Sequence, residues 1–116
     1  MSPITTAKWT LALGTAFVFL YFGIEKVLHP LLWIGFVPGW MKGLFGLTKE
    51  SWLQIIAGAE ITMGVLVIIP QRLAQKTGSF LASLQLVGVL TQAGWSDAAV
   101  RDSGLLCMTT ALWYLI

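Results

Sequence analysis

The sequence predicts an all-α protein: a transmembrane four-helix bundle with a short interfacial or re-entrant segment between spans one and two. Three observations predict this fold class: a hydrophobic share of 57%, a charged share of only 10%, and four long apolar segments. Soluble domains carry about 25% charged residues, so a soluble fold of 116 residues would lack a sufficiently polar surface. The mean hydropathy of +0.82 agrees with this. The chain is therefore predicted to be a single integral membrane domain over residues 1–116.

The first span is predicted over residues 6–28. It contains an uncharged run from Trp9 to Ile24, and at about 1.5 Å per residue it is long enough to cross the hydrocarbon core. A cleaved signal peptide is the competing interpretation, but only Lys8 precedes the apolar run and no Ala-x-Ala-like site follows it. We therefore expect an uncleaved span.

The connection over residues 29–50 is long and mostly apolar. Structureless loops of this length are uncommon in compact domains. The connection is therefore predicted to form a short helix that lies in the interface or re-enters the membrane, broken at Pro38-Gly39.

Three further spans are predicted, over residues 51–69, 77–96 and 97–116. Pro70 ends the second span, a polar turn over residues 70–76 leads to the third, and Ser96 or Asp97 can cap the fourth. An even number of spans places both termini on the same side. The tryptophans and a tyrosine agree with this topology: Trp33, Trp40, Trp52 and Trp95 at one interface, and Trp9, Trp113 and Tyr114 at the other.

The basic residues indicate an orientation. They divide into Lys8, Arg72 and Lys76 on the side of the termini, and Lys26, Lys42, Lys49 and Arg101 on the opposite side. Lys26 and Arg101 stand beside acidic residues and are expected to pair within the bundle, which leaves three against two. Cytoplasmic loops carry the excess of Lys and Arg, so the chain is predicted to be multi-pass in the plasma membrane, with both termini in the cytoplasm.

Residues that are scarce exclude several functions. Cys107 is the only cysteine and His29 the only histidine, which excludes an internal disulfide, a Cys-x-x-Cys redox pair, bis-histidine haem ligation and a His-rich metal site. No phosphate-binding loop is present. The seven basic residues form no block, so we expect no nucleic-acid partner. We predict no metal site and no cofactor bound by this chain alone.

Small residues recur at four-residue spacing, a pattern that lets helix backbones approach closely in lipid. The repeats are Thr10-Gly14, Ala12-Ala16, Gly58-Thr62 and Ala74-Gly78-Ala82. We interpret them as packing within one bundle.

Glu60 is the most informative residue because it stands in the middle of the second span. Insertion scales assign about 2.5–3.5 kcal/mol to Asp, Lys or Arg at a helix centre, and Glu is taken to be similar. The Leu, Ile and Val residues of the span contribute roughly −3 to −5 kcal/mol, so insertion survives. Glu60 is either a proton carrier or polar ligand, or a structural residue hydrogen-bonded to Gln85, which lies at matching depth in the third span.

A second set of polar residues shares one face of the bundle, where spans one and three end and spans two and four begin. It comprises Glu25, Lys26, His29, Gln54, Gln92, Asp97, Arg101 and Asp102. We expect either a binding or docking mouth or an ion-pair lock between helix ends, in which Asp97, Asp102 and Glu25 are the candidate partners of Arg101. The principal site candidates are Glu25, Glu60, Gln85, Arg101 and Asp102, and the remaining residues of this face are secondary.

The motifs resemble those of the DoxX family of small four-helix membrane proteins. The resemblance rests on Gly23-Ile24-Glu25-Lys26 followed by His29-Pro30, on Pro38-Gly39-Trp40, on residues 58–64 and on residues 101–106. Relatives of the family include the DoxD membrane subunit of thiosulfate:quinone oxidoreductase. The resemblance implies that Glu25, Glu60, Arg101 and Asp102 act together.

The expected function is a DoxX-like subunit or anchor of a prokaryotic membrane redox complex, with a polar site inside the bundle and a quinone as a candidate cofactor. The expected partners are the lipid bilayer, a membrane or peripheral redox protein, and further copies of the chain. One alternative is an oligomeric transporter or ion- or proton-permeation module, and a second is a structural or assembly protein. No catalytic residue is assigned.

Overall fold

The protein is all-α in a computed structural model that describes residues 2–93 and 97–116, apart from the side chains of residues 92, 93 and 98. No strand occurs among these residues. The elements are α1 (Pro3–Leu28), α2 (Pro30–Trp33), three 3₁₀ turns (Ile34–Phe36, Gly39–Met41 and Leu44–Gly46), α3 (Lys49–Ile68), α4 (Arg72–Ala93) and α5 (Asp97–Leu115). The all-α prediction is confirmed.

Local chemistry sets the helix ends. Ser2 caps α1 by accepting a 3.1 Å hydrogen bond from the Thr5 amide, which starts the helix at Pro3, earlier than predicted. Thr48 caps α3 in the same way, by accepting from the Ser51 amide at 3.1 Å. Helix α1 ends at Leu28 because the next residue, His29, precedes Pro30, and the residue before a proline avoids helical backbone angles.

The predicted polar turn over residues 70–76 is wrong in extent. The turn is confined to the residues between Ile68 and Arg72, where the Gln71 amide donates to the Ile69 carbonyl at 2.7 Å. Residues 72–76 already belong to α4. The prediction used the absence of charge to mark the span, whereas Arg and Lys are good helix formers and continue the helix into its polar end.

The connection between α1 and α3 is more irregular than one broken short helix. One turn of α-helix and three 3₁₀ turns follow one another, and the chain does break at Pro38 as predicted. Gly43 and Gly46 adopt positive φ angles of 82° and 73°, which glycine takes without a steric penalty. Phe45 between them has a φ of 54°.

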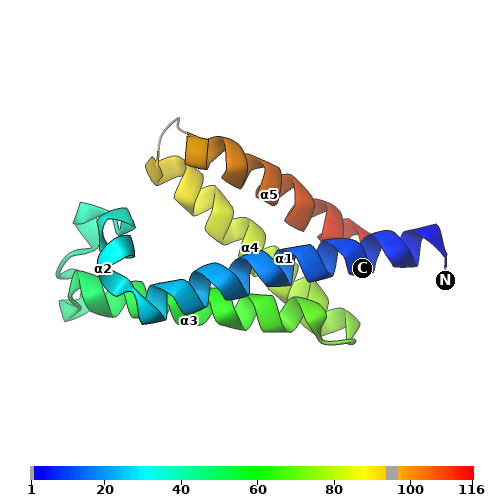
Figure 1. The fold of residues 1–116 in the computed structure, drawn as a ribbon, viewed down its shortest axis with the longest axis horizontal. Coiled ribbons are helices and arrows are strands. Elements are labelled where there is room, and N and C mark those ends of the chain that lie inside the picture. Colours follow the sequence, from blue (N-terminus) through cyan, green and yellow to red (C-terminus); the bar gives the residue numbers. More distant parts are fainter. Residues whose placement is uncertain (1, 94–96) are drawn as a thin grey trace.

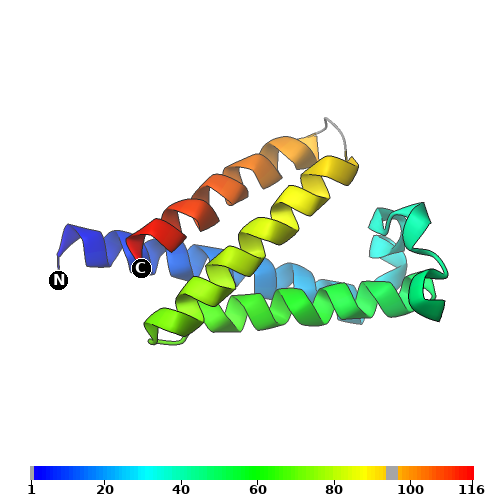
Figure 2. The same ribbon diagram turned by 180° about the vertical axis from the view of Figure 1, so that it is seen from behind.

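The four long helices pack around a shared core. Helix α1 runs antiparallel beside α3, and α4 and α5 form a second antiparallel pair that contacts α3 and α1 respectively (Figure 1). Both views show the α4–α5 pair inclined to the α1–α3 pair and furthest from it at the end near α2 (Figure 2). Two clusters fill the core: Ala12, Ala16, Val67 and Leu112, and then Phe19, Met63, Ala82 and Leu86.

The prediction that small residues pack within the bundle is confirmed for the repeats in α1 and α4 that contain Ala12 and Gly78, and it is wrong for Gly58-Thr62 in α3. Ala12, Ala16, Gly78 and Ala82 are buried. Gly58 and Thr62 are exposed, and nothing lies within 4 Å of where a Gly58 Cβ would stand. The close approach in α3 occurs at Gly64, which meets Leu20 and Ala16 of α1. Spacing alone cannot say which face of a helix meets its neighbour.

Among the described residues, two helices, α1 and α3, are long and apolar enough to cross a membrane. Only 28% of the apolar window of each is buried inside the protein, whereas the core helix of a soluble protein is mostly buried. The exposed remainder of α1 includes Leu13, Phe17 and Leu28, between 60% and 72% exposed. An apolar outer surface of this kind is typical of a face that contacts lipid or another protein.

Candidate functional site

The centre of the candidate site is an ion pair between Lys26 of α1 and Glu60 of α3. The side chains are 14% and 4% exposed, so both charges are largely removed from solvent. Helical side chains lean toward the N-terminus of their own helix. Because α1 and α3 are antiparallel, the Lys26 side chain leans from the end of α1 toward the level of Glu60. The Glu60 side chain leans toward the start of α3, which is the level of Lys26, and the two charged groups meet.

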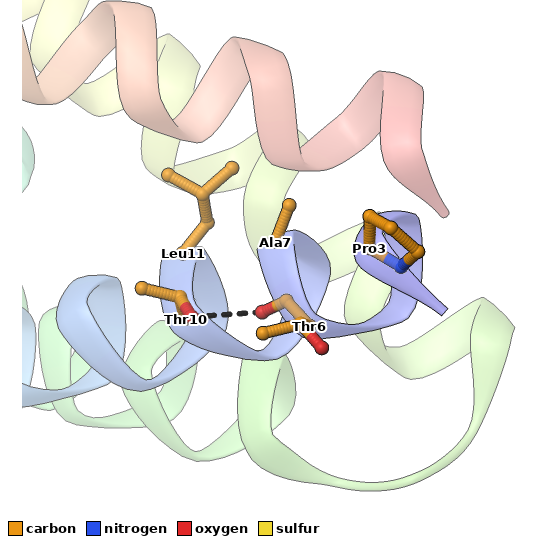
Figure 3. Close-up of a pocket in the computed structure, with 5 residues that line it drawn as sticks. All are labelled: Pro3, Thr6, Ala7, Thr10 and Leu11. Atoms are coloured by element: carbon orange, nitrogen blue, oxygen red, sulfur yellow. Dashed lines mark hydrogen bonds between the residues drawn. The ribbon is translucent and has the colours of Figure 1, made fainter. Parts of the chain in front are cut away.

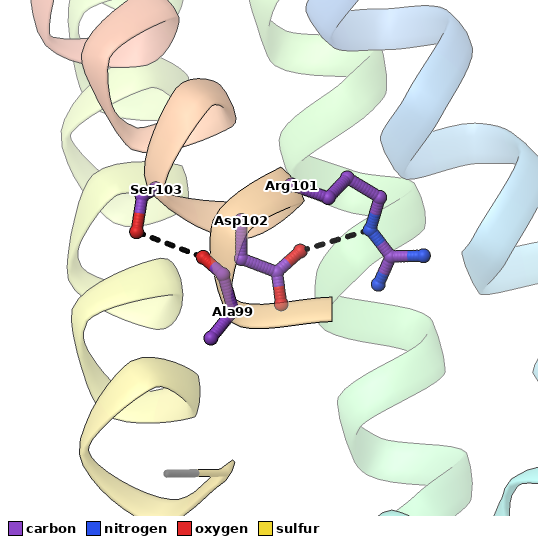
Figure 4. A network of polar contacts seen from close by, with 4 residues as sticks. All are labelled: Ala99, Arg101, Asp102 and Ser103. Carbon is purple, nitrogen blue, oxygen red and sulfur yellow. Dashed lines mark hydrogen bonds and ion pairs between the residues drawn. The ribbon is translucent and has the colours of Figure 1, made fainter. Parts of the chain in front are cut away.

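Helices α4 and α5 complete the surroundings of Glu60. Gln85 of α4 forms a side-chain hydrogen bond with Glu60, as their matching depth predicted, and Asp102 of α5 lies within electrostatic range of the same carboxylate. The Asp102 side chain is 10% exposed and accepts a 3.3 Å hydrogen bond from Arg101 Nε (Figure 4). All four long helices therefore contribute a polar side chain to one region, which we call the internal charged cluster: Lys26, Glu60, Gln85 and Asp102, with Arg101, whose side chain is 53% exposed, at its outer edge.

Two aromatic rings border the cations of this cluster. Lys26 Nζ lies 5.2 Å from the centroid of the Trp33 ring, and the Arg101 guanidinium lies 5.2 Å from that of Phe22. Figure 4 shows Arg101 extending from α5 toward α1, the helix that carries Phe22. The rings of Phe22 and Trp33 meet edge to face at 5.4 Å. Trp33 Nε1 is buried and has no acceptor among the described residues.

Lys26 and Arg101 both pair with acidic side chains of the bundle, as expected, but the partner of Lys26 comes from another helix. Lys26 pairs with Glu60 and not with Glu25, its neighbour in sequence. Glu25 is half-buried near the end of α1, and no ion pair joins it to a described residue, so the cross-bundle contact with Arg101 is wrong.

The secondary candidates lie mostly outside the cluster. His29 is exposed at the C-cap of α1, and Asp97 is exposed in the first turn of α5, where no ion pair joins it to a described residue. Gln54 is exposed and donates from Nε2 to the Lys26 carbonyl at 3.4 Å. The Gln92 side chain, Trp95 and the proposed Ser96 cap lie outside the described residues.

Sequence reasoning missed the central role of Lys26, although a signal for it exists. Ala12, Ala16, Phe19 and Gly23 are buried on one stripe of α1 at alternating spacings of four and three. Lys26 is the next position of this stripe, which places it on the packed face of the helix. No comparable pattern marks Trp33, because it lies on a short helix whose orientation depends on the connection.

An open hollow lies on the N-terminal half of α1, on the side facing the end of α5 (Figure 3). Its volume is about 670 Å³, and its lining consists of Pro3, Thr6, Ala7, Thr10 and Leu11. The Thr10 hydroxyl donates to the Thr6 carbonyl at 2.8 Å and so completes its hydrogen bonding locally. No titratable side chain lines this hollow, so it offers no group for acid–base chemistry.

The described residues contain no group of three or more His, Cys, Asp or Glu side chains placed to hold a metal ion. The cluster instead offers two cations, two carboxylates, one amide and two aromatic faces. Such a set can bind a planar polar head group or hold protons. Comparisons with protein-family models, curated proteins and solved structures find no match to this chain.

Proposed function

We propose that this chain is a small four-span membrane protein of the DoxX type that serves as a subunit or anchor of a prokaryotic membrane redox complex. The observation that carries the proposal is the buried Lys26–Glu60 pair, set among helices with apolar outer surfaces. Ionisable residues inside membrane helices are rare and face the interior of the helix bundle, where they mark functional sites. The lipid bilayer and a redox protein are the proposed partners.

A quinone is the proposed ligand of the internal charged cluster. The fit rests on the buried Trp33 N–H, an unused donor suited to a quinone carbonyl, and on the ring of Phe22, which suits a planar head group. Arg101 supplies a second donor, while Glu60 and Asp102 are placed to hold protons. A bound quinone supplies two-electron, two-proton redox chemistry, and the electrons come from a redox centre in a partner protein, since one His and one Cys ligate none here.

Replacing Trp33 with Phe is predicted to weaken the binding of a short-chain quinone analogue by about 2- to 12-fold. The substitution keeps a ring but removes the buried N–H that has no partner among the described residues, and a neutral hydrogen bond contributes about 0.5–1.5 kcal/mol. The measurement is the ligand-dependent shift of the melting temperature of the detergent-purified chain.

Trp113→Phe is the matched control for this experiment. This substitution also replaces an indole with a phenyl ring, but at the other end of the molecule, where the Trp113 ring lies beneath Lys76. The control is expected to bind the analogue like the wild type. Equal binding by the Trp33 and Trp113 variants, or no analogue-dependent shift in the wild type, contradicts the quinone proposal.

A proton-permeation module is the second candidate, and one observation favours it. Hydroxyl groups follow α4 away from Glu60: the half-buried Ser83 shares a 2.8 Å hydrogen bond with the buried Thr109 of α5, and the buried Ser79 lies one turn further along. Gln75, 2% exposed, continues this stripe. Side chains of this kind can form part of a relay through hydrocarbon.

If this candidate is correct, liposomes containing the protein should dissipate an imposed proton gradient, and Glu60→Gln should slow the flux at least tenfold, since the carboxyl that carries the proton is gone. Thr109→Val should slow it as well, because it removes the hydroxyl that contacts Ser83. Thr110→Val is the control, since Thr110 is exposed on the same helix. Flux no faster than in protein-free liposomes, measured with an entrapped pH-sensitive dye, excludes the candidate.

A further inference from the structure

The two ends of the molecule differ sharply in charge. Every acidic side chain belongs to the end that holds the internal charged cluster or to the middle of α3: Glu25, Glu50, Glu60, Asp97 and Asp102. The opposite end carries the two chain termini and the α3–α4 turn. Its charged side chains are the cations Lys8, Arg72 and Lys76, and no ion pair joins any of them to a described residue.

A pocket of about 280 Å³ lies among the side chains of this end. Lys8 and Trp9 of α1 line it, together with the α3–α4 turn, the start of α4 and the end of the chain: Pro70, Gln71, Arg72, Gln75, Leu115 and Ile116. We call it the terminal pocket. Gln75 is 2% exposed and is held in place by donating a 3.0 Å hydrogen bond to the Val67 carbonyl. Two cations and an anchored amide therefore converge on one hollow.

The backbone adds to the positive potential of the terminal pocket. Arg72 is the first residue of α4, and the first turn of this 22-residue helix contains no acid. A helix N-terminus carries about half a positive charge, so helices favour acidic side chains there and disfavour cations. An anion in the pocket would face Arg72, Lys8 and the free amides of the first turn together.

Interfacial side chains border the pocket. Trp9 lines it, with Lys8 Nζ 5.1 Å from the ring centroid, and Lys76 Nζ lies 4.3 Å above the nearby Trp113 ring of α5. Tryptophan sits preferentially at the level of the lipid head groups. Basic pockets between membrane helices at this level are typical binding sites for anionic lipid head groups.

We propose that the terminal pocket binds the phosphate head group of an anionic phospholipid through Lys8 and Arg72. The inference rests on the membrane location proposed above but not on the redox role or on the internal charged cluster. The positive-inside distribution of charge accounts for cations on this end of the molecule, but it does not account for their convergence with a buried amide on one pocket.

The test is native mass spectrometry of the full chain released from nanodiscs of phosphatidylglycerol and phosphatidylcholine. The wild type is expected to retain phosphatidylglycerol preferentially. Lys8→Gln with Arg72→Gln should weaken that retention by about fivefold per cation, equal to about 1 kcal/mol each. Lys8→Arg with Arg72→Lys keeps both charges and should retain the lipid. Inorganic phosphate added to the nanodiscs should not compete, because it lacks the anchoring in the bilayer.

The matched control is Lys42→Gln with Lys49→Gln, which removes two cations from the opposite end of the molecule. It is expected to retain phosphatidylglycerol like the wild type. Equal loss in both double variants indicates general charge attraction and overturns the proposal, as does equal retention in both. Displacement by millimolar inorganic phosphate would identify a free-anion site instead. A Glu60→Gln chain that loses redox coupling but still retains the lipid separates this site from the proposed function.

Discussion

Replacing Lys26 with Met is expected to lower the free energy of unfolding by about 3–5 kcal/mol, the usual effect of removing one partner of a buried ion pair. Lys26 is the cation paired with Glu60, and the Glu60 side chain is only 4% exposed. Methionine matches the length of the lysine stem but leaves a carboxylate among apolar helices. Reversible unfolding in mixed detergent micelles measures the change.

The reverse substitution, Glu60→Met, is expected to destabilise the protein less than Lys26→Met. Lys26 lies two residues before the end of α1, so its flexible stem can carry the ammonium group out to the interface. Glu60 lies near the middle of α3 and has a short side chain, so it cannot reach water. Equal losses for the two variants would contradict this depth argument.

The double variant Lys26→Met with Glu60→Met completes the thermodynamic cycle. Both charges are then absent, and replacing a buried pair by apolar side chains is often neutral or stabilising by about 1–4 kcal/mol. We expect stability equal to or above that of the wild type, together with loss of any activity of the internal charged cluster. Additive losses in the double variant would mean that the two side chains do not interact.

Gly23→Ala is expected to lower the free energy of unfolding by about 1–3 kcal/mol, the range typical of overpacked cores. A Cβ on Gly23 would lie 2.7 Å from Ile61 Cγ1 and 3.0 Å from the Ala57 carbonyl oxygen. The clash with backbone forces α1 away from α3. Because Lys26 lies one turn beyond Gly23, the separation should also weaken the Lys26–Glu60 pair.

Gly58→Ala in α3 is the control for this substitution. A Cβ added at Gly58 would have no neighbouring atom within 4 Å, so alanine should stabilise the helix by up to about 1 kcal/mol through its higher propensity. The two variants are compared by the same unfolding measurement. A neutral Gly23→Ala, or equal effects at the two positions, would contradict the close approach of α1 and α3.

Hydropathy located the long helices because each contains a long run of apolar side chains uninterrupted by charge. The predicted start of the fourth span at residue 97 agrees with α5. The boundary near Arg72 was misplaced because a charged residue ends an apolar run without ending a helix. Ser2 moved the start of α1 through one side-chain hydrogen bond, a feature that a hydropathy pattern does not contain.

The candidate site also contains one residue that the sequence revealed and one that only the structure revealed. Glu60 stood out in the sequence because a carboxyl at mid-span is costly wherever its neighbours lie. Its cation did not, because Lys26 is near a helix end and is adjacent to Glu25 in sequence. The choice of Glu60 over Glu25 depends on the antiparallel register of α1 and α3, which Gly23 and Gly64 allow by close contact.

Composition and uncharged apolar runs alone determined that the chain is helical, which segments form its long helices, and that one acid lies in the middle of an apolar helix. Tertiary structure alone decided that Lys26 meets Glu60, that Trp33 and Phe22 border the cations, and that Lys8 and Arg72 line one pocket. The physical reason is that the free energy of transferring a side chain from water depends on that residue alone and can be read from the sequence. Which two side chains meet depends on the register and rotation of two packed helices, which the sequence of either helix does not show.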